Sequence, residues 1–352
     1  MSQVHFGTQK LLYHIPRLNK MRSGHVVNPI YAHVEPVGHS SHWCLHCNGY
    51  HLKDDGIFLD EQVFNSLVDN FAKMDVKSMQ LGGKGEPFLH PQIVDIIGRA
   101  KAKKISVSVD TFCAPFDRVT MEAVLPQLSW LRLTMYAGTR DLYARLYKTS
   151  VERFDQILDS MAIAIDVKRR KKLETVIGAH AVVSEENVNT LVSYAKILKE
   201  LGASYFQVKP LFLKNQASEI WEYLSPANII LVLKELQSLE TPEFTVVIDA
   251  SRFAKAPRRQ YTSCTALPFY SEITSRGDVY TCGPHVGEAE FLCGSLKHHS
   301  FEEIWKSEQK NRAFKYCATS LDVSKCMPYC RPDEANQFLD ELARPPMHVN
   351  FI

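Results

Sequence analysis

Two hydrophobic patterns alternate along the chain from about residue 30 to residue 210. Short apolar runs predict strands, and runs with a period near 3.6 residues predict the helices between them. The expected strands are Ile30–Glu35, Ser78–Leu81, Ile105–Val109, Leu131–Tyr136, Val176–Val183 and Tyr205–Val208. The clearest helical segments are Leu59–Lys73, residues 93–100, Phe154–Ile165 and Val188–Leu201. Six successive strand–helix units predict an α/β fold with a parallel sheet, arranged as a partial (β/α)6 barrel.

The pattern changes after residue 210. A helix is expected at Leu224–Leu239, a strand at Phe244–Ile248 and another helix near Phe301–Glu308. A hairpin is expected between Phe269–Thr274 and Val279–Thr281, with Gly277 in its turn. We therefore divide the chain into four parts. They are an N-terminal arm (1–27), a TIM-like partial barrel (28–215), a connecting segment (216–258) and a small C-terminal α+β domain (259–352).

Composition narrows the class of protein. The 352 residues are 45% hydrophobic, which is enough for a large core. The net charge is +2, from 41 basic and 39 acidic residues, so nucleic acid and anionic membranes are not expected as partners. The first ten residues are polar and do not form a signal peptide, and no apolar run approaches the roughly 18–20 residues of a membrane span. We expect a cytoplasmic protein.

Nine cysteines are distributed unevenly along the chain. In a reducing compartment, spaced cysteines are more often metal ligands or catalytic groups than disulfides. Two lie close together near the N-terminus, Cys113 stands alone, and six fall in the last quarter. This asymmetry predicts two metal regions in two domains. The full set is Cys44, Cys47, Cys113, Cys264, Cys282, Cys293, Cys317, Cys326 and Cys330.

The N-terminal pair, Cys44 and Cys47, follows the first expected strand. This spacing alone suits zinc, a redox dithiol or an iron–sulfur cluster. The loop after the second expected strand contains Gly83, Gly85 and Glu86. Glycines let the backbone approach a ligand closely, and a carboxylate can accept hydrogen bonds from an ammonium group. Because chemistry in such barrels collects beyond the C-terminal strand ends, the two loops are expected to share one site.

Together these loops resemble the radical S-adenosylmethionine superfamily, in which three cysteines in a Cys-x-x-x-Cys-x-x-Cys motif hold a [4Fe–4S] cluster. The resemblance implies that Cys44 and Cys47 are cluster ligands. It implies that S-adenosylmethionine is cleaved to a 5′-deoxyadenosyl radical, which abstracts hydrogen from a substrate. The loop residues would contact the methionine end of the cofactor, and two further residues would contact its ribose. These cofactor contacts are Gly83, Gly85, Glu86, Thr134 and Asn187.

One position departs from the family motif. Ser40 stands where the first cysteine ligand is expected, and a serine is a much poorer iron ligand than a thiolate at neutral pH. Either this is an engineered one-atom replacement in a normal enzyme, or the natural protein has lost the ligand and is inactive or altered. His39 and His42 are alternative ligands, although a histidine in such a loop more often only forms hydrogen bonds.

A second set of cysteines resembles the auxiliary-cluster domains called SPASM and twitch. These domains extend many radical S-adenosylmethionine enzymes at the C-terminus. Four ligands suit one auxiliary [4Fe–4S] cluster, as in the smaller twitch type; Cys317 lies near a SPASM position but lacks a paired cysteine. Zinc is the alternative, because four thiolates also bind zinc tetrahedrally. The predicted ligands are Cys264, Cys282, Cys326 and Cys330.

Two cysteines are left over. Cys113, just past the third strand, and Cys293, in the auxiliary region, are candidate hydrogen donors to a substrate radical. The alternative for each is a small buried hydrophobic residue, and this alternative carries more weight. Four polar side chains near the strand ends are candidate substrate contacts, with an ordinary structural role as the alternative. They are Asp110, Tyr136, Lys209 and His285.

The function expected from the resemblance is hydrogen abstraction from a sugar or small natural product, leading to dehydrogenation or epimerisation. A reductase such as flavodoxin or ferredoxin is expected as the electron donor. One alternative is a peptide-modifying maturase. Others are a catalytically impaired relative that keeps the fold for binding or scaffolding, and a zinc-stabilised α/β protein of another class.

Overall fold

A single ten-stranded sheet organises the part of the chain that the computed structural model describes, which is residues 9–39, 55–112, 116–214, 221–223, 225–254, 259–345 and 347–351. The strand order is β12-β11-β10-β1-β2-β3-β4-β5-β6-β9. The strands are β1 (Tyr31–Val34), β2 (Ser78–Leu81), β3 (Ser106–Thr111), β4 (Leu128–Thr134), β5 (Val176–Val183), β6 (Tyr205–Pro210), β9 (Thr245–Ile248), β10 (Tyr270–Ile273), β11 (Asp278–Tyr280) and β12 (Leu292–Ser295). A separate two-stranded sheet pairs β7 (Phe212–Lys214) with β8 (Trp221–Tyr223).

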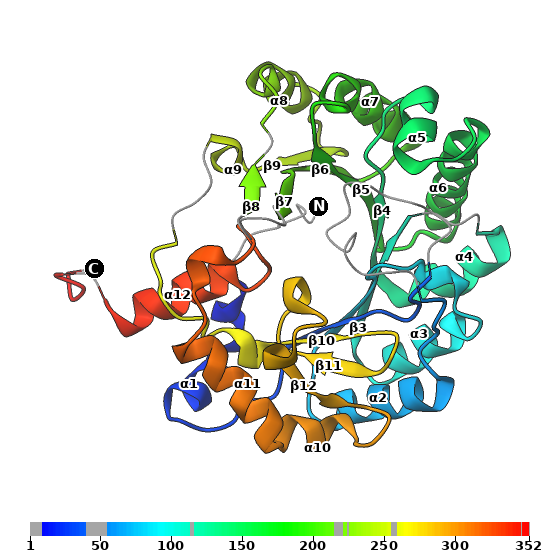
Figure 1. Ribbon diagram of the computed structural model, residues 1–352. Helices are drawn as coiled ribbons and strands as arrows, with labels where there is room; N and C mark the ends of the chain where they lie inside the picture. Colours follow the sequence, from blue (N-terminus) through cyan, green and yellow to red (C-terminus); the bar gives the residue numbers. More distant parts are fainter. Residues whose placement is uncertain are drawn as a thin grey trace.

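Strands β1 to β6 and β9 are parallel to their neighbours, and helices lie along the outer side of the curved sheet (Figure 1). The α/β class and the partial barrel are therefore confirmed. The α-helices are α1 (Ile15–Arg22), α2 (Glu61–Lys73), α3 (Ile93–Ala102), α4 (Arg118–Val124), α5 (Arg140–Tyr147), α6 (Glu152–Lys171), α7 (Leu191–Leu201), α8 (Ile229–Gln237), α9 (Ser251–Ala254), α10 (Phe301–Lys306), α11 (Glu308–Thr319) and α12 (Asp333–Ala343). Among the helices described, none is long and apolar enough to cross a membrane.

Helix α2 shows how local sequence sets these elements. Asp60 caps its N-terminus by accepting hydrogen bonds from the backbone of Gln62 and Val63. Phe64 and Phe71 lie on the buried face that packs into the main core. The cap therefore sets where the helix begins, and the buried aromatic residues set which face packs against the core.

The sheet continues from the barrel into the C-terminal region. Strand β10 pairs in parallel with β1, with Tyr31 opposite Tyr270, and β11 and β12 follow in antiparallel order. The N-terminal residues pack on the same region, because Leu11 and Leu18 share a core cluster with Phe269. The predicted domain bounds stay predictions, but the cysteine-rich region extends the barrel's own sheet.

Strand β4 differs from the expected strand Leu131–Tyr136. It starts at Leu128 and ends at Thr134. The backbone N–H of Tyr136 donates to the Tyr147 hydroxyl (3.0 Å), and its carbonyl accepts from the Asn187 amide (2.8 Å). Both backbone groups are therefore bonded to side chains instead of to a neighbouring strand.

Candidate functional site

The loop after β2 lies against the chain that leaves β1. The backbone N–H of Glu86 donates to the His39 carbonyl at 3.0 Å. A Cβ on Gly85 would lie 2.0 Å from the Val37 carbonyl oxygen, which real atoms do not allow. Glycine is therefore required at this position by close backbone approach. The described start of the first loop, residues 37–39, therefore meets the loop after β2.

A short backbone stem marks where the predicted ligand loop leaves and rejoins the fold. Gly38 N–H donates to the Ile57 carbonyl (2.7 Å), and Leu59 N–H donates to the Pro36 carbonyl (2.9 Å). The stem therefore places residues 39 and 55 beside the Gly85 loop. Four predicted residues lie outside the described part of the chain, so their roles stay predictions; they are Ser40, Cys44, Cys47 and Cys113. His42 also lies outside the described residues.

Two acidic residues that the sequence did not single out hold this mouth together. Glu35 accepts from the backbone N–H of Lys84 (2.9 Å) and from the Ser275 hydroxyl (2.9 Å). Asp55 pairs with the Lys84 ammonium at 3.0 Å and with the Arg276 guanidinium at 2.9 Å. Ser275 and Arg276 form the turn of the β10–β11 hairpin. The auxiliary region therefore contacts the barrel mouth through this turn.

These partners set the charge state of Asp55. Burial alone would raise the pKa of this carboxyl group. Hydrogen bonds from Lys84 and the Ile57 backbone, together with the Arg276 charge, outweigh burial and hold the pKa below its ordinary value. Asp55 is therefore an ionised anchor for the stem.

Glu86 is fully buried, and hydrogen-bond donors of the protein itself surround its carboxylate. Its carboxylate accepts from the Thr111 hydroxyl (2.9 Å to each oxygen), from Phe112 N–H (2.8 Å) and from Phe88 N–H (3.1 Å). The carboxylate thus ties the loop after β2 to the end of β3. Gly83 adopts a positive φ of +113° beside Glu35. The predicted contacts of Gly83, Gly85 and Glu86 with the cofactor stay predictions.

Of the two predicted ribose contacts, Thr134 is the last residue of β4 and Asn187 lies in the loop after β5. The Thr134 hydroxyl lies 3.1 Å from His180 Nδ1. The Asn187 amide donates to the carbonyls of Tyr136 (2.8 Å) and Val182 (2.7 Å), and its oxygen accepts from Ser184 N–H (2.9 Å). Asn187 therefore braces the ends of β4 and β5. Contact of either residue with a ribose stays a prediction.

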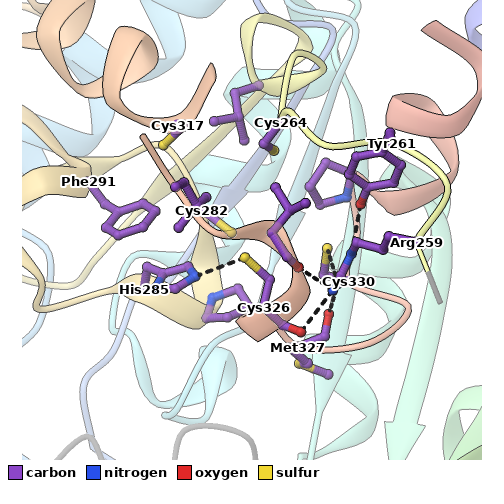
Figure 2. Close-up of a pocket in the computed structure, with 15 residues that line it drawn as sticks. Arg259, Tyr261, Cys264, Cys282, His285, Phe291, Cys317, Cys326, Met327 and Cys330 are labelled. Atoms are coloured by element: carbon purple, nitrogen blue, oxygen red, sulfur yellow. Dashed lines mark hydrogen bonds between the residues drawn. The ribbon is translucent and has the colours of Figure 1, made fainter. Parts of the chain in front are cut away.

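The four predicted auxiliary ligands line one pocket (Figure 2). Within the described residues, no three or more His, Cys, Asp or Glu side chains are arranged around a single metal ion. Cysteine thiolates are the ligands that iron–sulfur clusters take, so the side-chain chemistry of this pocket fits such a cluster. The pocket cysteines are Cys264, Cys282, Cys326, Cys330 and also Cys317.

Cys317 is the pocket residue that the sequence left out of the ligand set. It is fully buried, lies in helix α11 and forms a small apolar cluster with Leu267, Tyr280 and Phe291. Its backbone carbonyl accepts from the N–H of Cys264 at 3.3 Å. In the sequence, the only indication that Cys317 is a ligand is its position near a SPASM cysteine. The absence of a neighbouring cysteine weakens that indication.

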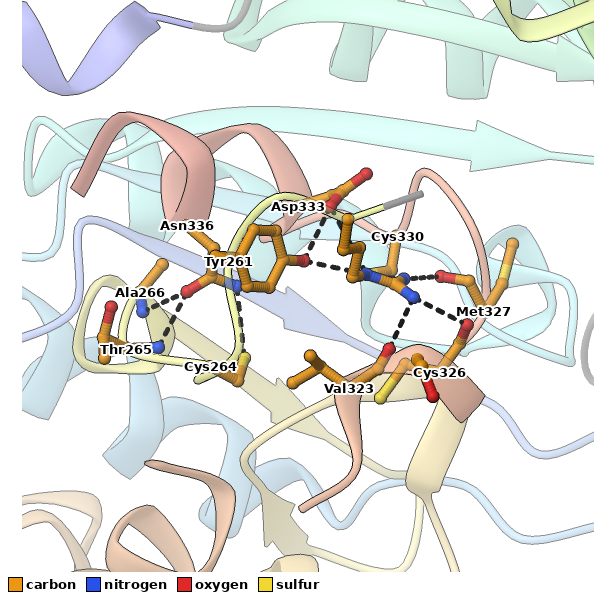
Figure 3. Close-up of polar contacts among 12 residues, drawn as sticks. Tyr261, Cys264, Thr265, Ala266, Val323, Cys326, Met327, Cys330, Asp333 and Asn336 are labelled. Carbon is orange, nitrogen blue, oxygen red and sulfur yellow. Dashed lines mark hydrogen bonds and ion pairs between the residues drawn. The ribbon is translucent and has the colours of Figure 1, made fainter. Parts of the chain in front are cut away.

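Three side chains place nitrogen atoms near the pocket sulfurs (Figures 2 and 3). Asn336 Nδ2 donates to Cys264 Sγ at 3.2 Å, and Arg259 Nη2 lies 3.9 Å from Cys330 Sγ. His285 Nε2 lies 3.8 Å from Cys326 Sγ, and its ring stacks on Phe291 with the ring centres 3.9 Å apart. Hydrogen bonds to cluster sulfurs tune the reduction potential. His285 therefore faces the auxiliary pocket, while its contact with a substrate stays a prediction.

The pocket disfavours the ionised form of its cysteine side chains when no metal is bound. Burial, and then the neighbouring cysteines, raise the pKa of Cys282 well above its ordinary value. Burial likewise raises the pKa of Cys330 to about 12, although the Arg259 charge acts in the opposite direction. Bound iron would supply the positive charge that keeps these groups deprotonated. The chemistry of the donor set thus fits a metal cluster.

The other candidate hydrogen donor, Cys293, lies in the main hydrophobic core. It is 1% exposed on β12, and burial raises its thiol pKa to about 12. These surroundings suit the packing role. Its role as a hydrogen donor stays a prediction.

Polar side chains cross the inner face of the sheet. Arg132 forms an ion pair with Asp110, whose carboxylate also accepts from Gln80. Gln80 in turn accepts from the Tyr31 hydroxyl at 2.6 Å. Asp110 is therefore occupied by protein partners, Tyr136 is buried beside the Tyr147 ring, and Lys209 lies partly buried on β6. Their contacts with a substrate stay predictions.

Comparison with known proteins decides the class of the C-terminal region. Residues 264–332 match SPASM, an iron–sulfur cluster-binding domain. The C-terminal region is therefore similar to a SPASM domain, and the chain as a whole has the fold of radical S-adenosylmethionine proteins. The solved structure of Streptococcus suis SuiB bound to S-adenosylmethionine supports that fold. It superposes with a TM-score of 0.65 at 14% identity, covering 90% of this chain and 76% of SuiB.

Two curated proteins are also similar. A tungsten-containing aldehyde ferredoxin oxidoreductase cofactor-modifying protein from Pyrococcus furiosus is 23% identical over 189 residues, 51% of each protein. Mycofactocin maturase MftC from Mycolicibacterium smegmatis is 22% identical over 295 residues, 80% of this chain and 71% of MftC. The match thus spans about half of the first relative.

The radical S-adenosylmethionine fold with its SPASM domain confirms the resemblance drawn from the motifs. This combination implies S-adenosylmethionine, a [4Fe–4S] cluster in the barrel and auxiliary iron–sulfur in the SPASM domain. The comparisons do not support the expected sugar substrate.

Proposed function

We propose that this radical S-adenosylmethionine SPASM protein is a maturase that modifies a peptide. The observation that carries the proposal is the SPASM match together with the similarity to the maturase MftC. That similarity extends over 80% of this chain. A structure of SuiB bound to its precursor peptide SuiA has the same fold, with a TM-score of 0.63. The comparisons thus favour the peptide alternative over the sugar or small natural product.

The chain's own residues would prepare the site for this chemistry. When bound, the barrel cluster would supply the electron that cleaves S-adenosylmethionine. Gly85 leaves room for the backbone of the ligand loop, and Glu35 and Asp55 fix the stem from which that loop starts. The hairpin turn at Ser275 and Arg276 holds the SPASM domain against the same mouth. A substrate would therefore meet both domains at one edge of the sheet.

Ser40 favours a second candidate, a relative that binds but does not cleave. The test compares the parent chain with Ser40→Cys after anaerobic reconstitution, measuring iron per chain and 5′-deoxyadenosine release. About eight irons with cofactor cleavage in the cysteine variant would support a radical enzyme whose activity depends on this ligand. About four irons with no cleavage in both proteins would contradict the enzyme and favour a binding role. Zinc without iron would contradict the cluster assignment.

Substrate class needs a separate measurement. The reconstituted cleavage-competent protein would be incubated with a mixed pool of synthetic peptides and, separately, with a pool of sugars and amino sugars. Peptide-dependent release of 5′-deoxyadenosine with a mass change in a peptide would support the maturase. Stimulation and mass change only in the sugar pool would contradict it.

A further inference from the structure

A turn next to Cys282 carries a histidine that faces the auxiliary pocket. His285 follows Cys282 by three residues, at the end of the short helix η6 (Gly283–His285), and its side chain lines the pocket. The Nε2 atom of His285 lies 3.8 Å from the sulfur of Cys326 (Figure 2). Short spacings of this kind are common between ligands of one metal site. His285 is therefore a candidate iron ligand that a pattern of cysteines alone does not include.

Two neighbours fix the orientation of the His285 ring. The Nδ1 atom lies 3.1 and 3.0 Å from the two carboxylate oxygens of Glu288, and the ring stacks on Phe291 with an interplanar angle of 4°. Phe291 itself is 1% exposed and packs against Cys317 in a small apolar cluster. Glu288 N–H donates to the His285 carbonyl and Phe291 N–H to the Glu288 carbonyl, each at 3.2 Å. The local fold therefore sets the direction of the ring without help from a metal.

The contact with Glu288 determines which ring nitrogen offers a lone pair to the pocket. An ionised carboxylate only accepts hydrogen bonds, so Nδ1 carries the proton of a neutral His285 ring. The lone pair of Nε2 then points towards Cys326. Histidines that bind metals almost always donate their other ring N–H to a carboxylate, a carbonyl or water. His285 and Glu288 have this arrangement, and the cysteine-lined pocket is on the Nε2 side of the ring.

The separation of His285 and Cys326 suits two donors on one metal atom. A metal that binds sulfur at about 2.3 Å and imidazole nitrogen at about 2.0–2.1 Å, with a tetrahedral angle between them, holds these donors about 3.6 Å apart. The distance from Nε2 to Sγ is 3.8 Å. Only a small movement would therefore bring both atoms into bonding distance of one iron.

We propose that Nε2 of His285 and the thiolate of Cys326 bind the same iron of the auxiliary cluster. The other three irons of a [4Fe–4S] cluster would each take one of the remaining predicted ligands, Cys264, Cys282 and Cys330. Histidine is an established iron ligand in clusters, because two histidines bind one iron of a Rieske centre. Every auxiliary iron then has a protein ligand, so the cluster offers no open iron to a substrate. The assignment does not depend on the substrate class.

The same contacts have one competing interpretation. A doubly protonated ring would donate Nδ1–H to Glu288 and Nε2–H to the sulfur of Cys326. His285 would then be a positioning residue that only forms a hydrogen bond at the edge of the cluster. The two arrangements differ in the electronic contact with iron. A bound nitrogen shares the unpaired spin of the cluster directly, whereas a hydrogen-bonded nitrogen is separated from iron by a proton and a sulfur atom.

The test uses the full-length chain with Cys44→Ala and Cys47→Ala, so that nitrogen ligands near the barrel cluster do not contribute. The protein is produced with isotope-labelled histidine, reconstituted with iron and sulfide, reduced, and measured by pulsed electron paramagnetic resonance. A strongly coupled histidine nitrogen is expected, and it should be absent after His285→Gln. A weak coupling accompanied by an exchangeable proton, or no histidine coupling, would overturn the proposal. A chain that takes up no auxiliary iron would overturn it as well.

Iron analysis in the same background gives an independent measurement. Because His285 would still hold its iron in Cys326→Ala, about four irons per chain are expected, and about three when His285→Gln is added. An equal loss of iron in Cys326→Ala and in the double variant would contradict ligation by His285. His298→Gln is the matched control, since His298 is exposed in the same domain and should keep both the iron and the nitrogen coupling. None of these readouts requires cleavage of S-adenosylmethionine, so they are independent of the proposed function.

Discussion

The side-chain amide of Asn336 donates to the sulfur of Cys264 at 3.2 Å, while its oxygen accepts from the backbone of Thr265 and Ala266 at 2.7 and 2.8 Å. One residue of α12 therefore both shapes the chain around Cys264 and faces the sulfur with a donor (Figure 3). This arrangement separates the role of the amide in folding from its effect on the cluster.

Asn336→Asp keeps the acceptor for Thr265 and Ala266 but replaces the donor facing Cys264 with a carboxylate oxygen. Removing an N–H to a cluster sulfur disfavours the reduced state. At about 1 kcal/mol for one hydrogen bond, the auxiliary potential should fall by roughly 40 mV or more. A redox titration followed by electron paramagnetic resonance measures this shift. An unchanged potential would show that the amide does not tune the cluster.

Arg259 holds the loop that carries Cys326 and Cys330. Its guanidinium donates to the carbonyls of Val323 (2.6 Å) and Cys326 (3.0 Å), and also to the carbonyl of Met327. Arg259→Lys cannot reproduce this planar set of contacts. With roughly 1.5–3 kcal/mol for each hydrogen bond from a charged donor, the variant should lose at least about 2 kcal/mol of unfolding free energy.

The Arg259→Lys variant should also lose auxiliary iron while the barrel cluster is retained. Iron analysis and denaturant unfolding measure the two effects. Arg312→Lys is the control, because the Arg312 side chain is 73% exposed on α11. Equal iron and equal stability in both variants would argue against a role for Arg259 in the loop.

Asp55 predicts a dependence of stability on pH. Its folded pKa is depressed, so its contribution is fully present above the unfolded value near 3.9 and is lost as the pH falls through the folded value. Parent and Asp55→Asn should therefore differ in unfolding free energy at neutral pH and converge in acid. Denaturant unfolding at a series of pH values tests this. A difference that stays constant down to acid pH would contradict the ion-pair anchor.

Local sequence signals predicted the repeated barrel units well. Ser78–Leu81 and Val176–Val183 are strands with the bounds that were expected. The turn at Gly277 was also recognisable, since its positive φ of +80° suits glycine. Such features depend on a few neighbouring residues.

Contacts between distant segments could not be predicted in the same way. The pairing of β10 with β1 joins residues about 240 positions apart, and no local period encodes it. Glu35 and Asp55 were missed for this reason, because their partners Ser275 and Arg276 lie 240 and 221 positions later in the chain. Cys317 reaches the auxiliary pocket from a helix, without the close cysteine spacing that identifies a ligand.

Gly85→Ala tests whether the barrel mouth depends on close backbone approach. The new methyl group would lie 2.0 Å from the Val37 carbonyl oxygen and 2.6 Å from that of His39, so backbone at the start of the ligand loop must move. We expect a loss of roughly 1–3 kcal/mol in unfolding free energy, as for other overpacked sites. Binding of S-adenosylmethionine by the iron-loaded chain should fall in parallel, because the loop that precedes Ser40 is displaced.

Gly98→Ala is the matched control for this change. Gly98 lies within α3, and its nearest contact is the flexible end of Gln127 at 3.1 Å. Alanine there should be neutral or add up to about 1 kcal/mol of stability, because it favours the helix. Denaturant unfolding and calorimetric titration with S-adenosylmethionine compare the two variants. If Gly85→Ala binds the cofactor as tightly as Gly98→Ala, the mouth tolerates a side chain at residue 85, and the steric requirement inferred from the Val37 contact is wrong.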